Sequence, residues 1–155
     1  MKFFLFLLHS LFIVCNIQAK ESDQLTINRA IERGLNIVQK GAGNYPNNRE
    51  CFSCHHQTLP MLAMREASEA GISIDEELMQ EQVHFIRDYF EDRMDSVAEG
   101  KSVGGRSLTA GYLLWSFELA GVKKDQFSDA FVSYLIHHQK NDGNWDVQTN
   151  RPPSE

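Results

Sequence analysis

EAGISID (residues 69–75) and its echo LAGVKKD (residues 119–125) each end one expected helix and lead into the next. In both, helix-forming residues stop at an Ala-Gly pair, which is typical of a helix C-terminus. An aspartate follows four positions after each glycine. Ser73 and Glu76 have the spacing of a capping box for the helix after the turn. An echo at an offset of 50 residues indicates that the chain repeats one supersecondary unit.

The expected helices alternate between two kinds. They cover residues 24–39, 58–70, 76–90, 108–120 and 125–138. The helices over 58–70 and 108–120 are oily and should be buried, and Thr58 is the predicted cap of the first of them. The helices that follow each of them are amphipathic and should face water on one side. No stretch alternates apolar and polar residues over the length of a strand, so the predicted fold class is all-α, made of tandem helix-hairpin repeats. Residues 93–106 are expected to form a mobile or rim loop.

Residues 1–19 have the pattern of a secretory signal peptide, with Lys2 before an apolar run and Ala19 at the cleavage position. The apolar run is shorter than the roughly 20 residues that cross a bilayer. Cleavage leaves one domain over residues 20–155, which we expect to be periplasmic or secreted, with no stable membrane span in the mature chain. Loss of Lys2 changes the formal net charge from −6 to −7. An acidic chain without a basic patch is not expected to bind nucleic acid.

A second echo, at an offset of 100 residues, carries a resemblance to a known family. It pairs Gln39-x-x-x-Gly43-x-Tyr45 with Gln139-x-x-x-Gly143-x-Trp145. Both segments resemble the QW motif of the squalene and hopene cyclase and protein prenyltransferase superfamily. The resemblance implies an α/α toroid of inner and outer helices. Chemically, the glutamine amide can bond backbone groups at a helix end while the aromatic packs over the glycine, so we interpret these six residues as structural.

The chain departs from that family in its chemistry and in its length. It contains neither the aspartate-rich acid motif of the cyclases nor a recognisable zinc-ligand set of the prenyltransferases, so no catalytic residue is carried over. A toroid needs about twice as many helices as this chain provides. The sequence also ends at residues 151–155, where another helix pair is expected to begin. We therefore expect an N-terminal fragment, or half of an assembly.

CFSCHHQ (residues 51–57) concentrates the reactive side chains. Cys51, Cys54 and His55 form the C-x-x-C-H pattern of covalent c-type haem attachment, with two thiols for the vinyl groups and an imidazole for the iron. In an oxidising compartment the two cysteines could instead form a disulfide or remain plain thiols. Zinc could take both thiolates and the imidazole of either His55 or His56. These interpretations stay open, and the cofactor is either haem c or none.

Three functions are consistent with these features. The first is an exported, non-catalytic binding or interaction scaffold of the α/α-toroid type, whose partner is a small apolar ligand or another protein. The second is a redox protein in which Cys51, Cys54 and His55 hold haem c on the same scaffold. The third is a terpenoid cyclase-type enzyme whose catalytic part lies beyond residue 155.

Overall fold

A computed structural model describes residues 2–146, and this part of the chain is helical without a strand. The α-helices are α1 (Lys2–Asn44), α2 (Leu59–Glu69), α3 (Glu76–Phe90), α4 (Met94–Ala98), α5 (Arg106–Leu119) and α6 (Gln126–His138). Single turns of 3-10 helix span Tyr45–Asn47 and Glu91–Arg93, and a π-helical turn spans Cys54–Thr58. The prediction of an all-α fold is confirmed for the described residues. Residues 151–155, where a further helix pair is expected to begin, lie outside them.

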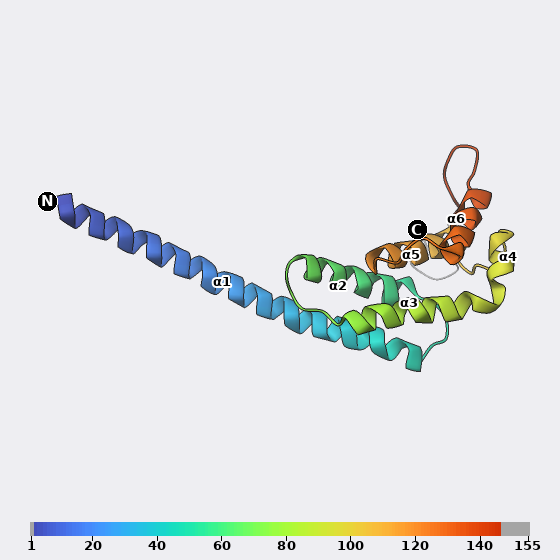
Figure 1. Cartoon of the computed structure of the whole chain (residues 1–155), viewed down its shortest axis with the longest axis horizontal. Coiled ribbons are helices and arrows are strands. Elements are labelled where there is room, and N and C mark those ends of the chain that lie inside the picture. Colours follow the sequence, from blue (N-terminus) through green and yellow to red (C-terminus); the bar gives the residue numbers. More distant parts are fainter. Residues whose placement is uncertain (1, 147–155) are drawn as a thin grey trace.

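The helix α1 is longer than the predicted helix over residues 24–39. Its N-terminal half extends away from the other helices, whereas its C-terminal end packs against α2 and α3 (Figure 1). From there the contacts pass from α2 to α5 and from α5 to α6. Within residues 2–146, no helix combines the length and the apolarity that a membrane crossing needs. The signal peptide over residues 1–19 remains a prediction.

The two stretches quoted first adopt the same turn. Gly71 and Gly121 have positive φ angles of 77° and 66°, which glycine adopts without steric cost. At the first turn the N–H of Ile72 donates to the carbonyl of Ala67. At the second turn the N–H of Val122 makes the equivalent bond five residues back, also at 2.9 Å. Bonds of this kind end a helix in the Schellman motif, so α2 and α5 stop in the same way.

Each turn is followed by an aspartate that caps the next helix. Oδ1 of Asp75 accepts from the N–H of Leu78 at 2.9 Å, and Oδ1 of Asp125 accepts from the N–H of Ser128 at 3.0 Å. The capping box predicted at Ser73 is therefore wrong, because the cap of α3 lies two residues later. Serine and aspartate are similarly good N-cap residues, and the sequence alone did not separate them.

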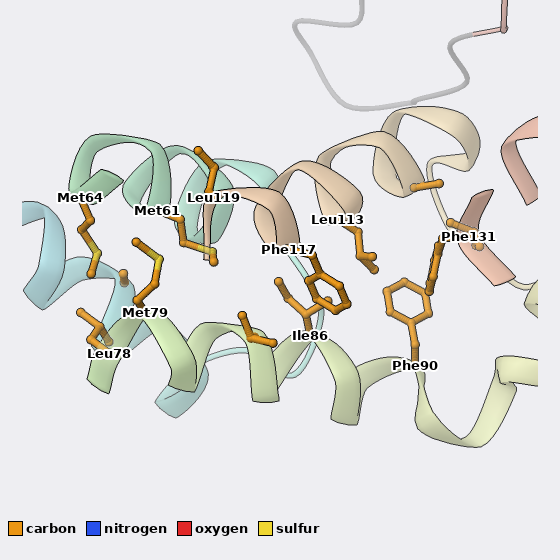
Figure 2. Close-up of a cluster of buried hydrophobic side chains, with 14 of the residues drawn as sticks. Met61, Met64, Leu78, Met79, Ile86, Phe90, Leu113, Phe117, Leu119 and Phe131 are labelled. Carbon is orange, nitrogen blue, oxygen red and sulfur yellow. The ribbon is translucent and has the colours of Figure 1, made fainter. Parts of the chain in front are cut away.

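The apolar core lies between α2 and α5 on one side and α3 on the other, with side chains pointing toward one another across this space (Figure 2). The labelled residues of this cluster are Met61, Met64, Leu78, Met79, Ile86, Phe90, Leu113, Phe117, Leu119 and Phe131. The rings of Phe90 and Phe131 meet edge to face, with centroids 4.9 Å apart, and so join α3 to α6. Each side chain of this size contributes about 1.5 to 3 kcal/mol when it is fully buried.

The helix α5 is buried on one face only, whereas the sequence predicted that it is the buried member of its pair. Ala110, Leu113 and Phe117 face the core. On another part of the surface, Leu108 is 38% exposed and Trp115 is 37% exposed. The amphipathic helix α3, by contrast, buries six residues. The oily and amphipathic helices therefore contribute similarly to this core, and α5 leaves apolar side chains open to solvent.

The segment expected to be a mobile or rim loop over residues 93–106 is instead packed. It forms α4, which contacts α6, and it buries Val97 and Val103. Nε2 of His138 lies 2.8 Å from the carbonyl oxygen of Gly100, so the ring donates a hydrogen bond when Nε2 carries the proton. The two buried valines are the residues that indicate packing, whereas the glycines and charges around them favour a loop.

Candidate functional site

The CFSCHHQ segment lies between the end of α1 and the start of α2, and the side chain of Gln57 closes it. The N–H of Ser53 donates to Oε1 of Gln57 at 2.8 Å, and the N–H of Gln57 donates to the carbonyl of Ser53 at 3.0 Å. Gln57 is fully buried, and its Nε2 has no hydrogen-bond partner among the described residues. The π-helical turn over Cys54–Thr58 begins here, and such turns are frequent at functional sites.

Thr58 anchors this segment to α5 and does not cap α2. Its backbone is already helical, and its side chain makes no capping bond. The hydroxyl instead lies 2.8 Å from Oγ of Ser116 and donates to the carbonyl of Tyr112 at 3.3 Å. The predicted cap is therefore wrong. The partners lie more than fifty residues away in sequence, so no local pattern indicated them.

Cys51 and Cys54 are unpaired thiols, and both are partly exposed. Sγ of Cys51 lies 3.5 Å from the hydroxyl of Tyr45, and Sγ of Cys54 lies 3.4 Å from Nδ1 of His55. Their sulfurs are not bonded to each other in the structure, and a disulfide in an oxidising compartment stays a prediction.

The two histidines of the segment are both exposed but have different surroundings. The contact between Nδ1 of His55 and Cys54 leaves the Nε2 of His55 open to a ligand. The ring of His56 stacks on Tyr45, with centroids 4.7 Å apart and planes inclined by 18°, and its Nδ1 lies 3.2 Å from Oγ of Ser53.

Tyr45 links the end of α1 to the cysteine segment. Its hydroxyl donates to the carbonyl of Cys51 at 3.0 Å, and its ring meets Phe85 of α3 edge to face. Burial raises the pKa of Tyr45 above its usual value of 10.0, and the contact of its hydroxyl with the Cys51 thiol raises it further. The phenol is therefore a neutral donor at physiological pH. The glutamine–aromatic motif predicts only a structural role for Tyr45 and does not indicate these contacts.

The two glutamine–aromatic segments bond backbone groups, as predicted, but they adopt different conformations. In the first, Oε1 of Gln39 accepts from the N–H of Asp75 at 2.9 Å, and Gly43 lies inside α1, where an added Cβ would be 3.3 Å from Leu78. In the second, Nε2 of Gln139 donates to the carbonyl of Gly143, which has a φ of +86° in a loop.

The aromatic residues of these segments also differ from the prediction that they pack over glycine. Nε1 of Trp145 donates to the carbonyl of Leu135 at 2.7 Å and so satisfies a group at the end of α6. Tyr45, the matching residue of the first segment, uses its hydroxyl on Cys51 instead. The first segment therefore joins separate elements, whereas the second stabilises one helix end.

The side chains of the cysteine segment can be compared with what a zinc site and a haem c site would each require. Among the described residues, no group of three or more His, Cys, Asp or Glu side chains is gathered to hold a metal ion. A zinc site at Cys51, Cys54 and His55 or His56 would therefore require rearrangement of the segment. Covalent attachment of haem c would need two accessible thiols, and an open imidazole beside them could bind its iron. Cys51, Cys54 and His55 fit that requirement.

Comparisons of the chain with protein-family models, curated proteins and solved structures find no match. The resemblance to the squalene cyclase superfamily therefore stays a prediction from the glutamine–aromatic segments.

Proposed function

We propose that this chain is an exported helical-repeat protein that carries haem c on Cys51 and Cys54, with His55 as an iron ligand. The observation that best supports the proposal is the state of this segment. Both thiols are unpaired and partly exposed, and the adjacent imidazole has its Nε2 open. The anchors at Gln57 and Thr58 hold these groups at the start of α2.

Attachment of haem c would require two thiol additions from this chain. Each thiol would add across one vinyl group, so that Sγ bonds to carbon and its proton passes to the neighbouring vinyl carbon, without an external oxidant. The imidazole of His55 would bind iron through Nε2, while its Nδ1 stays near Cys54. A haem bound in this way supplies one-electron redox chemistry. The chain's own residues hold the attachment groups at the protein surface.

The test is to express the full chain in a host that matures c-type cytochromes and to record the pyridine haemochrome spectrum. We expect covalent haem in the wild type and none in the double variant Cys51→Ala with Cys54→Ala. His137→Ala is the matched control, because that histidine lies on α6, and it should keep the wild-type haem content. A featureless visible spectrum of the wild-type protein would exclude the proposal.

A second candidate function is an α/α-toroid scaffold that binds a small apolar ligand. It is favoured by the exposed apolar side chains of α5, Leu108 and Trp115, beside the half-buried Tyr112. In a toroid the inner helices line the central cavity, and α5 has the apolar composition expected of such a helix. This function does not depend on haem at Cys51 and Cys54.

A further inference from the structure

His55 and His56 are adjacent in the chain, so either imidazole could reach an iron held by the same two cysteines. A protein that presents both would bind haem in two arrangements unless one histidine is held elsewhere. The two imidazole rings have different surroundings, and within residues 2–146 only one of them is held by a stacked aromatic ring. The inference that follows rests on the proposed function.

We infer that Tyr45 is a positioning residue that holds His56 out of the ligand position and leaves His55 as the ligand beside Cys51 and Cys54. Tyr45 comes from the end of α1, outside the C-x-x-C-H pattern. Its ring and its hydroxyl contact the two ends of the cysteine segment.

The ring contact restrains His56. With planes inclined by only 18° and centroids 4.7 Å apart, Tyr45 covers one face of this imidazole. Nδ1 of His56 is engaged by Oγ of Ser53 at 3.2 Å. Turning the His56 ring away from its present position would break both contacts. Among the described residues no comparable ring contact restrains His55, whose contact is Nδ1 with Sγ of Cys54.

The tyrosine is itself held in place. Phe85 of α3 meets the ring edge to face, with centroids 6.2 Å apart, and the hydroxyl donates to the carbonyl of Cys51 at 3.0 Å. Tyr45 therefore connects the backbone of the first cysteine to the side chain of the second histidine. Aromatic stacking of this kind corresponds to a preference of roughly twofold to tenfold for the stacked arrangement.

The first test uses protein produced without haem and assigns the imidazole protons by NMR. Stacking on Tyr45 should shift the ring protons of His56 upfield relative to those of His55. Tyr45→Phe keeps the ring and should keep the shift, whereas Tyr45→Ala should abolish it. Tyr89→Ala is the control, because that ring contacts Phe90 and Arg93, and it should leave both histidines unchanged. Equal shifts for His55 and His56 in the wild type would overturn the inference.

The second test uses haem-loaded protein and counts the sets of haem methyl resonances in the cyanide-bound ferric form. The wild type should give a major set at the same positions as the single set of His56→Ala, together with a minor second set. In Tyr45→Ala the second set should rise at least about twofold relative to the wild type. Adding His56→Ala to Tyr45→Ala should remove the second set. Tyr45→Leu serves if the alanine variant does not fold, because leucine fills space beside Phe85 but has no ring face.

The outcomes separate the two proposals. A wild type that carries no haem overturns the proposed function and the sorting role together. A haem-loaded wild type whose spectrum is unchanged in Tyr45→Ala overturns the sorting role alone. Loss of all haem in Tyr45→Phe would also overturn it, since that variant retains the stacked ring.

Discussion

Gly100 is the residue on which the packing of the segment between α3 and α5 depends most directly. Its φ is +78°, and a Cβ built there would lie 2.5 Å from Cδ2 of His137 on α6. An L-residue in this left-handed conformation costs about 1 to 2 kcal/mol, and displacement of the exposed His137 ring adds to that cost. The conformation is set by the backbone, so repacking cannot remove the whole penalty.

Gly100→Ala should therefore lower the free energy of unfolding by about 1 to 3 kcal/mol. Gly104→Ala is the matched control, because a Cβ there meets nothing within 4 Å. Denaturant unfolding measures both, with the midpoint compared at an unchanged m-value. Equal midpoints for the two variants would show that this segment does not need the left-handed glycine.

At the scale of the element, the start of α6 combines a cap with an ion pair. Asp125 and Ser128 form a reciprocal capping box, and Oδ2 of Asp125 lies 2.6 Å from Nη2 of Arg87 on α3. The guanidinium of Arg87 also lies over the rings of Phe117 and Phe127, at 5.0 and 4.9 Å from their centroids. One arginine thus joins α3 to both α5 and α6.

The charge of Asp125 makes the stability of this junction depend on pH. The hydrogen bond from the Ser128 N–H, and then the Arg87 guanidinium, hold the pKa of Asp125 below its usual 3.8 in spite of partial burial. A carboxylate with a lowered pKa in the folded state contributes stability above its unfolded pKa. That contribution is lost as the pH falls through the folded pKa.

Asp125→Asn should therefore be less stable than the wild type at pH 7, by about 1 kcal/mol or less, because the pair is partly exposed and asparagine can still cap. The difference should shrink below about pH 4 and vanish below the folded pKa. Thermal unfolding across pH 2 to 7 measures it. Asp129→Asn removes one negative charge from the same helix and is the control. A gap that stays constant to pH 2 would contradict the role of the Asp125 charge.

Across the molecule, the two glutamine–aromatic segments differ in how far along the chain their hydrogen-bond partners lie. Gln39 reaches from α1 to the backbone at the start of α3, whereas Gln139 bonds four residues ahead of itself. Gln39→Ala should lower the free energy of unfolding by about 0.5 to 1 kcal/mol, because it removes a bond between α1 and the start of α3 and leaves the exposed Asp75 N–H to water. Gln139→Ala, the matched control, should cost less than about 0.5 kcal/mol, because its bond is equally exposed, lies within one loop and joins no second helix. Equal losses would argue that neither bond links separate helices.

Much of this fold could be predicted from the sequence because its signals are local. Gly71 and Gly121 end their helices through bonds to residues five positions back, so a short pattern contains both partners. The cap at Asp75 was missed because Ser73 is a competing cap residue in the same turn. Thr58 was misassigned because its hydroxyl partner, Ser116, is contributed by another helix hairpin.

In the candidate site, too, the local features could be predicted and the contacts between distant elements could not. Cys51, Cys54 and His55 could be read from five consecutive residues, and their unpaired, partly exposed state agrees with that pattern. The restraint on His56 could not be predicted, because it depends on how the end of α1 meets the turn before α2. Tyr45 was visible in the sequence only as the aromatic member of a structural motif.

The exposed face of α5 gives the scaffold function its own test. An apolar probe such as 1-anilinonaphthalene-8-sulfonate should bind there, because Leu108 and Trp115 are each more than a third exposed while the opposite face fills the core. Replacing both by serine should weaken probe binding about tenfold, the loss expected when roughly 1.5 kcal/mol of apolar contact is removed. It should also lower the free energy of unfolding by about 1 to 3 kcal/mol, because each side chain still buries more than half of its surface.

The control for this prediction lies on α6, where Val132 and Ile136 are 42% and 67% exposed. The double serine variant at these positions removes a comparable amount of exposed apolar surface from α6. A toroid places its cavity along the inner helices, so only the α5 variant should lose the probe in fluorescence titrations. Equal loss in both variants would mean that the probe recognises exposed apolar surface in general, and α5 would then have no claim to line a binding cavity.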